Sequence, residues 1–68
     1  MILISYYTSN TGRIIIEGKK QLAPNNFIVV DSFAGISNMG SSLSKKISLV
    51  IEKMNRLGLV INVDYKFV

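Results

Sequence analysis

The chain holds few side chains that could carry catalysis. Its 68 residues include no cysteine and no histidine. The four carboxylates are Glu17, Asp31, Glu52 and Asp64. No two of them have a spacing that forces them together, and no histidine is present to activate a serine. We therefore expect a protein that is not an enzyme and that needs no metal or other cofactor.

A glycine- and serine-rich segment, residues 35–42, is the first candidate for binding. It precedes a predicted helix, a setting in which backbone amides can hold a phosphate or a carboxylate. The spacing of Gly35 and Gly40 imitates a Walker A motif, but Ser41 stands where that motif needs its lysine. We therefore reject a nucleotide hydrolase. Anion binding by Gly40, Ser41 and Ser42 remains one hypothesis, and a plain serine cap on the helix is the simpler alternative.

Five residues of the predicted helix form the second candidate: Lys45, Lys46, Leu49, Lys53 and Arg56. On a helical wheel Lys45, Lys53 and Arg56 fall within about 80° of one another. Lys46 borders these three bases, and Leu49 lies among them where solvent is expected. Such a face could contact a protein or a nucleic-acid backbone. The alternative is a solvated face that a Glu52–Arg56 pair supports.

The elements that must position these residues can be inferred from alternation and turn signals. Residues 2–8 alternate as a first strand, and Asn10 and Gly12 indicate a hairpin loop over residues 9–13. Three consecutive isoleucines favour a second strand over residues 13–19. A third strand is predicted over residues 27–33. Its first half is apolar on both faces, which predicts a central place in the sheet.

A competing interpretation takes Thr8 to Gly12 as a phosphate loop and starts a helix at Arg13, which resembles the beginning of a flavodoxin. Thr11 and Gly12 fit that family's loop. Arg13 and Ile14 do not supply its usual polar residues, and the chain has about half the length that the family needs. We prefer the hairpin.

A helix is predicted from Ser41 or Ser42 to Leu57. Its core-facing stripe would contain Leu43, Ile47, Val50, Ile51, Met54 and Leu57. Gly58 is a typical left-handed terminator, with Leu59 folding back on the last turn. Residues 59–68 then alternate as a final strand, with Leu59, Ile61 and Val63 on the side of the helix. Tyr6 or Tyr7, with Val60 and Val68, would lie on the open face of the sheet, which could serve proteins or single-stranded nucleic acid.

The order strand-strand-strand-helix-strand predicts an α+β fold, a small antiparallel or mixed four-stranded sheet with one helix packed on one face, in a single domain over residues 1–68. Hydrophobic residues make up 49% and charged residues 18% of the chain, as in folded proteins. No apolar run is long enough to cross a membrane, and no signal peptide is recognisable, so we expect a cytoplasmic protein. A core this small also allows a homo-oligomer.

A net charge of +4 favours acidic partners. Our leading hypothesis is a small binding module that docks another protein through the open sheet face or the basic helix face. Ten isoleucines and six asparagines, against two alanines, suggest an AT-rich gene such as those of phages or mobile elements, where the role would be accessory or inhibitory. Nucleic-acid binding by the basic helix face is the alternative, and anion binding at residues 35–42 comes third.

Overall fold

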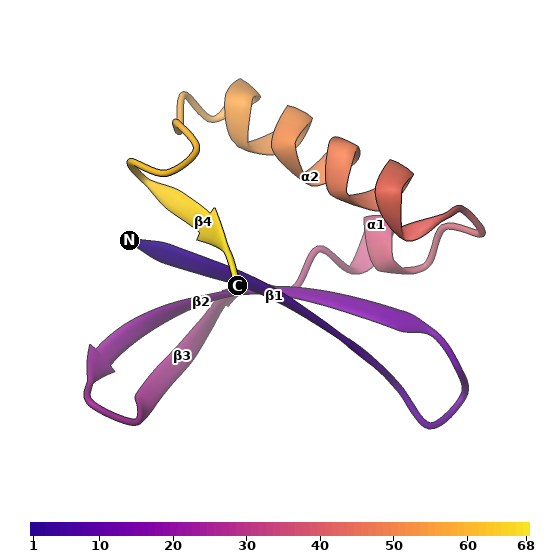
Figure 1. Cartoon of the computed structure of the whole chain (residues 1–68), viewed down its shortest axis with the longest axis horizontal. Helices are drawn as coiled ribbons and strands as arrows, with labels where there is room; N and C mark the ends of the chain where they lie inside the picture. Colours follow the sequence, from indigo (N-terminus) through magenta and orange to yellow (C-terminus); the bar gives the residue numbers. More distant parts are fainter.

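A computed structural model describes all 68 residues as a four-stranded mixed sheet with two helices (Figure 1). The elements are β1 (Ile2–Thr8), β2 (Ile14–Ala23), β3 (Asn26–Asp31), α1 (Ala34–Ser37), α2 (Leu43–Arg56) and β4 (Tyr65–Phe67). The strand order is β3-β2-β1-β4, with β1 antiparallel to β2, β2 antiparallel to β3, and β4 parallel to β1. The predicted α+β class and the order of the four strands and the long helix are confirmed, and the short helix α1 is an addition to that order.

The β1–β2 hairpin confirms the preferred interpretation of the N-terminal third. The amide of Ser9 donates to the carbonyl of Arg13 at 2.8 Å, and that of Gly12 donates to Ser9 at 2.9 Å. Gly12 adopts a φ of 80°, which glycine takes without steric cost. The chain therefore enters β2 at Ile14, and the flavodoxin-like helix from Arg13 is wrong.

The core lies between α2 and one face of the sheet. Its buried apolar residues are Ile4, Ile16, Phe33, Val50, Met54 and Tyr65. Gly18 makes room for the Phe33 ring, because a Cβ at Gly18 would lie 3.4 Å from that ring and 3.2 Å from Ile2. Full burial of an aliphatic or aromatic side chain stabilises a fold by about 1.5–3 kcal/mol, so these few residues supply most of the packing energy.

The ends of α2 follow their sequence signals. The Ser42 hydroxyl caps the helix by accepting from the amide of Lys45 at 3.3 Å. At the other end, Leu59 donates to Met54 and Gly58 to Asn55, each at 3.0 Å, which is a Schellman motif. The predicted stripe is correct for Val50 and Met54, but Leu57 is 61% exposed. Lys46 lies in the stripe instead, so the buried face is turned toward the basic side.

Two local predictions are wrong. Residues 34–37, expected as loop, form α1, whose first turn follows Phe33 in a left-handed conformation (φ 40°). The expected ten-residue final strand is reduced to β4, because residues 60–64 form a tight turn. There the amide of Asp64 donates to the carbonyl of Val60, and the Asp64 carboxylate accepts from the Val60 amide, both at 2.8 Å. Ile61 and Val63 are consequently exposed.

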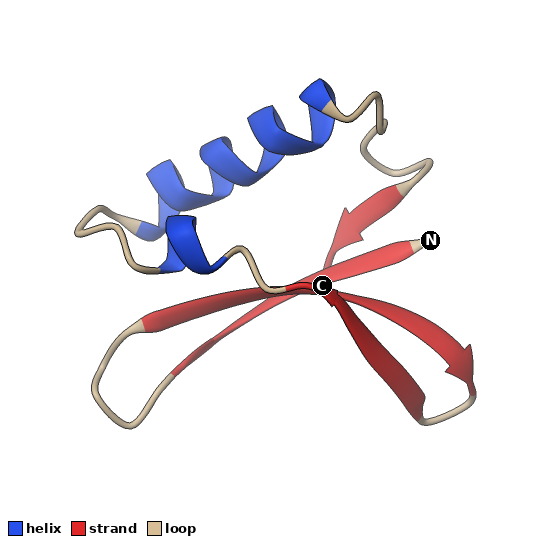
Figure 2. Ribbon diagram, turned by 180° about the vertical axis from the view of Figure 1, so that it is seen from behind, coloured by secondary structure: helices blue, strands red, loops and turns tan.

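The position of β3 is the largest departure from expectation. Its two apolar faces predicted a central strand, yet β3 forms an edge of the sheet. Every residue from Lys20 to Val30 is exposed. Figure 2 shows the physical reason: both helices lie on one side of the sheet, while the strongly twisted β2–β3 hairpin points away from them. One helix cannot cover the whole sheet.

Candidate functional site

The outer end of the β2–β3 hairpin gathers large apolar side chains in solvent. We call residues 20–30 the apolar hairpin. Its five large apolar side chains are Leu22, Phe27, Ile28, Val29 and Val30, each 44–57% exposed. Exposed leucines or valines are ordinary when scattered singly, but a contiguous group marks an interaction surface.

Both faces and one edge of the apolar hairpin are uncovered. The register pairs Val29 with Lys19 on the face away from α2, and Ile28 with Lys20. No strand pairs with the outer edge of β3, so its backbone donors and acceptors on that side face solvent. Residues 26–30 contain neither proline nor charge, the usual devices that protect an edge strand from pairing.

The open face of the sheet adds a hollow beside the apolar hairpin. It has a volume of about 310 Å³ and is lined by Leu3, Ser5, Lys19, Phe27 and Val68. Lys66 pairs with Leu3 on the neighbouring strand β4, so lysines border an apolar centre. A basic rim around an apolar surface suits a partner that carries acidic residues beside an apolar segment.

The tyrosines of β1 are both exposed, and neither enters the core. Tyr6 and Tyr7 are 50% and 51% exposed on opposite sides of the strand. Tyr7 lies on the open face next to Glu17, and a hydrogen bond to the Glu17 carboxylate raises the pKa of the phenol above its ordinary value. Val68 lies on this face as predicted, whereas Val60 belongs to the turn before β4.

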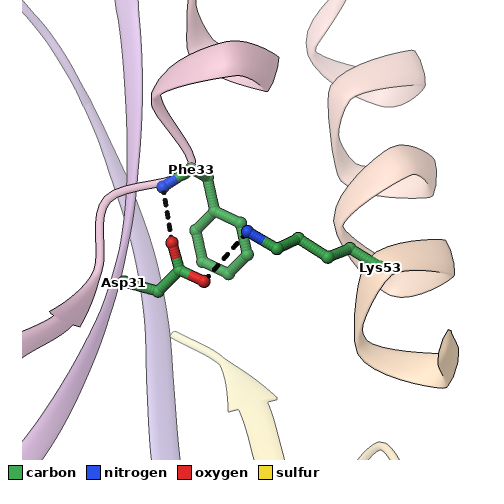
Figure 3. Close-up of polar contacts among 3 residues, drawn as sticks. All are labelled: Asp31, Phe33 and Lys53. Atoms are coloured by element: carbon green, nitrogen blue, oxygen red, sulfur yellow. Dashed lines mark hydrogen bonds and ion pairs between the residues drawn. The ribbon is translucent and has the colours of Figure 1, made fainter. Parts of the chain in front are cut away.

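The predicted basic helix face is broken up by the tertiary structure. Lys46, expected near solvent, is only 4% exposed, and Leu49 is half-buried. Arg56 pairs with Glu52 along the helix. The Lys53 ammonium lies 3.0 Å from Asp31 Oδ2 and 4.9 Å from the centre of the Phe33 ring (Figure 3). Only Lys45 remains exposed without an ionic partner.

The Asp31–Lys53 pair joins β3 to α2 at the inner end of the apolar hairpin. Partial burial acts to raise the pKa of Asp31, but hydrogen bonds from the Phe33 amide and the Lys53 ammonium outweigh it, and the pKa is lowered. The Phe33 amide lies 3.0 Å from Asp31 Oδ1. This ion pair therefore has a structural role in holding β3 against the helix layer.

A second cavity, of about 450 Å³, lies between the β1–β2 loop and the connection from α1 to α2. Its wall contains the predicted residues Gly40 and Ser41, together with Lys46 and Arg13. Ser42 serves as the helix cap instead. Arg13 could not be predicted as a residue of this cavity from the sequence, because it lies 33 positions before Lys46 and only the fold brings the two residues together.

No group of three or more acidic residues lies close enough together to hold a metal ion, and no helix has the length and apolar character needed to span a bilayer. Comparisons with protein-family models, curated proteins and solved structures find no match to this chain.

Proposed function

We propose that the protein is a non-enzymatic binding module that docks another protein by pairing a strand of that protein with β3. The observation that carries this proposal is the apolar hairpin, which is apolar on two faces and ends in an unprotected strand edge. Residues with this pattern are typical of strands that are buried on both sides. An added strand would give β3 the central position that its sequence predicts.

Strand addition would use both the unpaired backbone of β3 and its apolar side chains. Backbone hydrogen bonds to the partner strand satisfy the free donors and acceptors of β3, and side-chain contacts give specificity. Phe27 and Val29 would contact the partner on the open face, and Ile28 on the other. Each apolar side chain that becomes buried contributes on the order of 1–2 kcal/mol, part of which offsets the loss of motion on association.

The charge around the apolar hairpin selects the chemistry of the partner. Lys20 belongs to it, Lys19 pairs with its Val29, and Lys66 lies farther along the same row of the sheet, next to Leu3. The whole chain carries a charge of +4. We therefore expect an extended apolar segment flanked by aspartate or glutamate, and we expect two copies of this chain to repel each other. A module of this kind needs a surface and no reactive group, which suits an accessory or inhibitory role.

Site-specific crosslinking tests the proposal. A photoreactive amino acid replaces Ile28 in one variant and Val63 in a control, since Val63 is even more exposed to solvent (67% against 44%) but lies in the turn before β4. In lysate of the producing cell, we expect the Ile28 variant alone to crosslink one protein. A synthetic peptide from the crosslinked segment should bind the unmodified chain, and Val29→Lys should weaken that binding at least tenfold without lowering the melting temperature.

Two results would contradict the proposal. Equal crosslinking at positions 28 and 63 would mean nonspecific adhesion, and a crosslink between two copies of the chain would mean self-assembly. Nucleic-acid binding receives less support, because the basic helix face has lost Lys46 to the interior and two of its bases to ion pairs. Nuclease treatment before crosslinking separates this alternative.

A further inference from the structure

We infer that the cavity between the β1–β2 loop and the N-terminus of α2 binds a phosphate group, with Lys46 and Arg13 as its cationic ligands. This inference concerns the opposite end of the sheet from the apolar hairpin and does not depend on the proposed function. It rests on a buried lysine, a residue with an unpartnered hydroxyl and a second base, which all line this cavity.

Lys46 is the central observation. Its side chain is 4% exposed, and its ammonium makes one hydrogen bond, to the carbonyl of Ser37 at 3.2 Å. The two ion pairs of the molecule involve Lys53 and Arg56, so Lys46 has no carboxylate partner. An ammonium offers three donors, and a buried charge without a counter-ion is strongly destabilising. A bound anion would supply the missing opposite charge.

Ser41 is the second and independent observation. Its hydroxyl oxygen is buried and has no hydrogen-bond partner, and the residue lines the same cavity. Buried hydroxyls normally find a partner, so an orphaned one indicates a missing group. The wall also includes the residues just before the 14-residue helix α2, whose first-turn amides and dipole favour negative charge.

Arg13 supplies a charge from the other side of the cavity. Its side chain is exposed, and its guanidinium donates to Asn38 Oδ1 at 2.9 Å, which fixes the arginine beside the α1–α2 connection. Four of its five donors remain for a ligand. None of the ten residues that line the cavity is acidic, so the wall suits an anion and not a cation. Planar guanidinium and a buried ammonium together are typical ligands of phosphate.

The volume of about 450 Å³ admits a phosphate group with a small organic substituent. The phosphate could belong to a small molecule or to a nucleic-acid strand, and both sources have the same chemistry at Lys46 and Arg13. The test therefore needs three probes: inorganic phosphate, adenosine monophosphate and a single-stranded oligonucleotide.

Titration followed by amide NMR tests this inference. With ionic strength held constant by sodium chloride, we expect phosphate and adenosine monophosphate to shift the amides of Gly12, Ser41 and Lys46 and to raise the melting temperature. Tighter binding of the mononucleotide than of the oligonucleotide would assign a small-molecule phosphate, and the reverse order a nucleic-acid strand. No shift with any probe, or equal effects of phosphate and chloride, would overturn the site.

Two neighbouring lysines provide a matched control. Lys46→Met keeps the apolar stem and removes the charge, and it should weaken phosphate binding about tenfold or more. Lys45→Met removes the adjacent exposed charge and should leave the affinity within about twofold. Arg13→Gln, on an exposed side chain, should weaken binding several-fold even if Lys46→Met fails to fold. Unchanged affinity in Arg13→Gln and in a folded Lys46→Met would refute the inference, and Val29→Lys should not affect it.

Discussion

The two halves of β2 share the same secondary structure but differ in their exposure to solvent. In the first half Ile16 and Gly18 are buried beneath the helix layer, whereas Lys20 to Ala23 are exposed. Both halves pair with antiparallel neighbours, β1 and then β3. The difference lies in cover: α2 and Phe33 pack on the first half, and nothing packs on the second. Backbone pairing alone therefore does not make a strand part of the core.

This contrast separates stability from interaction. The residues under α2 hold the fold together, and their loss should be felt in the free energy of unfolding. The apolar hairpin contributes less to that free energy in the isolated chain, since about half of the surface of its large apolar side chains stays in water after folding. Its residues can therefore be selected for binding a partner without a large change in the free energy of unfolding. The following predictions test this division.

The largest expected effect is that of a core truncation. Ile16→Ala should lower the free energy of unfolding by about 2–4 kcal/mol, because it removes a fully buried side chain and leaves a cavity. Val29→Ala, on the apolar hairpin, should change it by less than about 0.5 kcal/mol. Urea denaturation followed by circular dichroism measures both. Similar losses in the two variants would mean that the hairpin belongs to the core.

Substitution of Asp31, which lies between the core and the apolar hairpin, should lower the free energy of unfolding by a smaller amount. Asp31→Ala removes the acceptor of the Phe33 amide and the partner of Lys53, and should cost about 1–2 kcal/mol. Asp31→Asn retains an oxygen for the amide and should cost less. Denaturation of the two variants gives the order. If the two substitutions cost the same, the ion pair is the dominant interaction and the amide bond adds nothing.

Acid should reduce the contribution of Asp31 to the free energy of unfolding. Folding lowers the pKa of Asp31 below its ordinary value of 3.8, so its contribution is fully present above pH 3.8 and is lost as the pH falls through the lower, folded-state pKa. The contribution is at most about 1 kcal/mol, since the pair is partly exposed. Denaturation at pH 6 and at pH 2.5 should show a smaller loss in Asp31→Asn than in the unmodified chain. An identical loss would assign the acid sensitivity to other carboxylates.

The smallest expected effect concerns Tyr65. Its ring is fully buried against Phe67 and its hydroxyl has no hydrogen-bond partner. Tyr65→Phe removes the unsatisfied hydroxyl and keeps the ring, so stability should be unchanged or rise by up to about 1 kcal/mol. The melting temperature measures this. A clear loss of stability would show that an ordered water or ligand satisfies the hydroxyl.

Local signals predicted most of the fold. Gly12 and Gly58 each adopt the left-handed conformation that a turn or a helix end needs, and Ser42 caps α2 as its residue type suggests. These features depend on contacts within a few residues. The prediction of a long final strand was wrong because a local turn replaces its first half. Alternating side chains at residues 59–64 resemble a strand, but Asn62 and Asp64 stabilise a turn there.

The candidate sites were less predictable because they depend on distant residues. Lys46 appeared to lie near the solvent side of the helix, and only the packing of α1 against α2 buries it. Arg13 reaches the same cavity through the β1–β2 hairpin. The apolar hairpin did leave a signal, since residues 27–30 are apolar on both faces. The pattern indicated correctly that these residues suit burial, but not that the chain itself leaves them uncovered.

Residue types and their order determined the first three strands, the helix α2 and the loop between β1 and β2, because each depends on backbone preferences and side-chain chemistry over short distances. The tertiary structure decided which surfaces are covered. A single amphipathic helix has one apolar stripe and can bury only the part of a twisted sheet that lies beneath it. Where the sheet turns away from α2, an apolar strand remains exposed, and where α1 closes against α2, a lysine becomes buried.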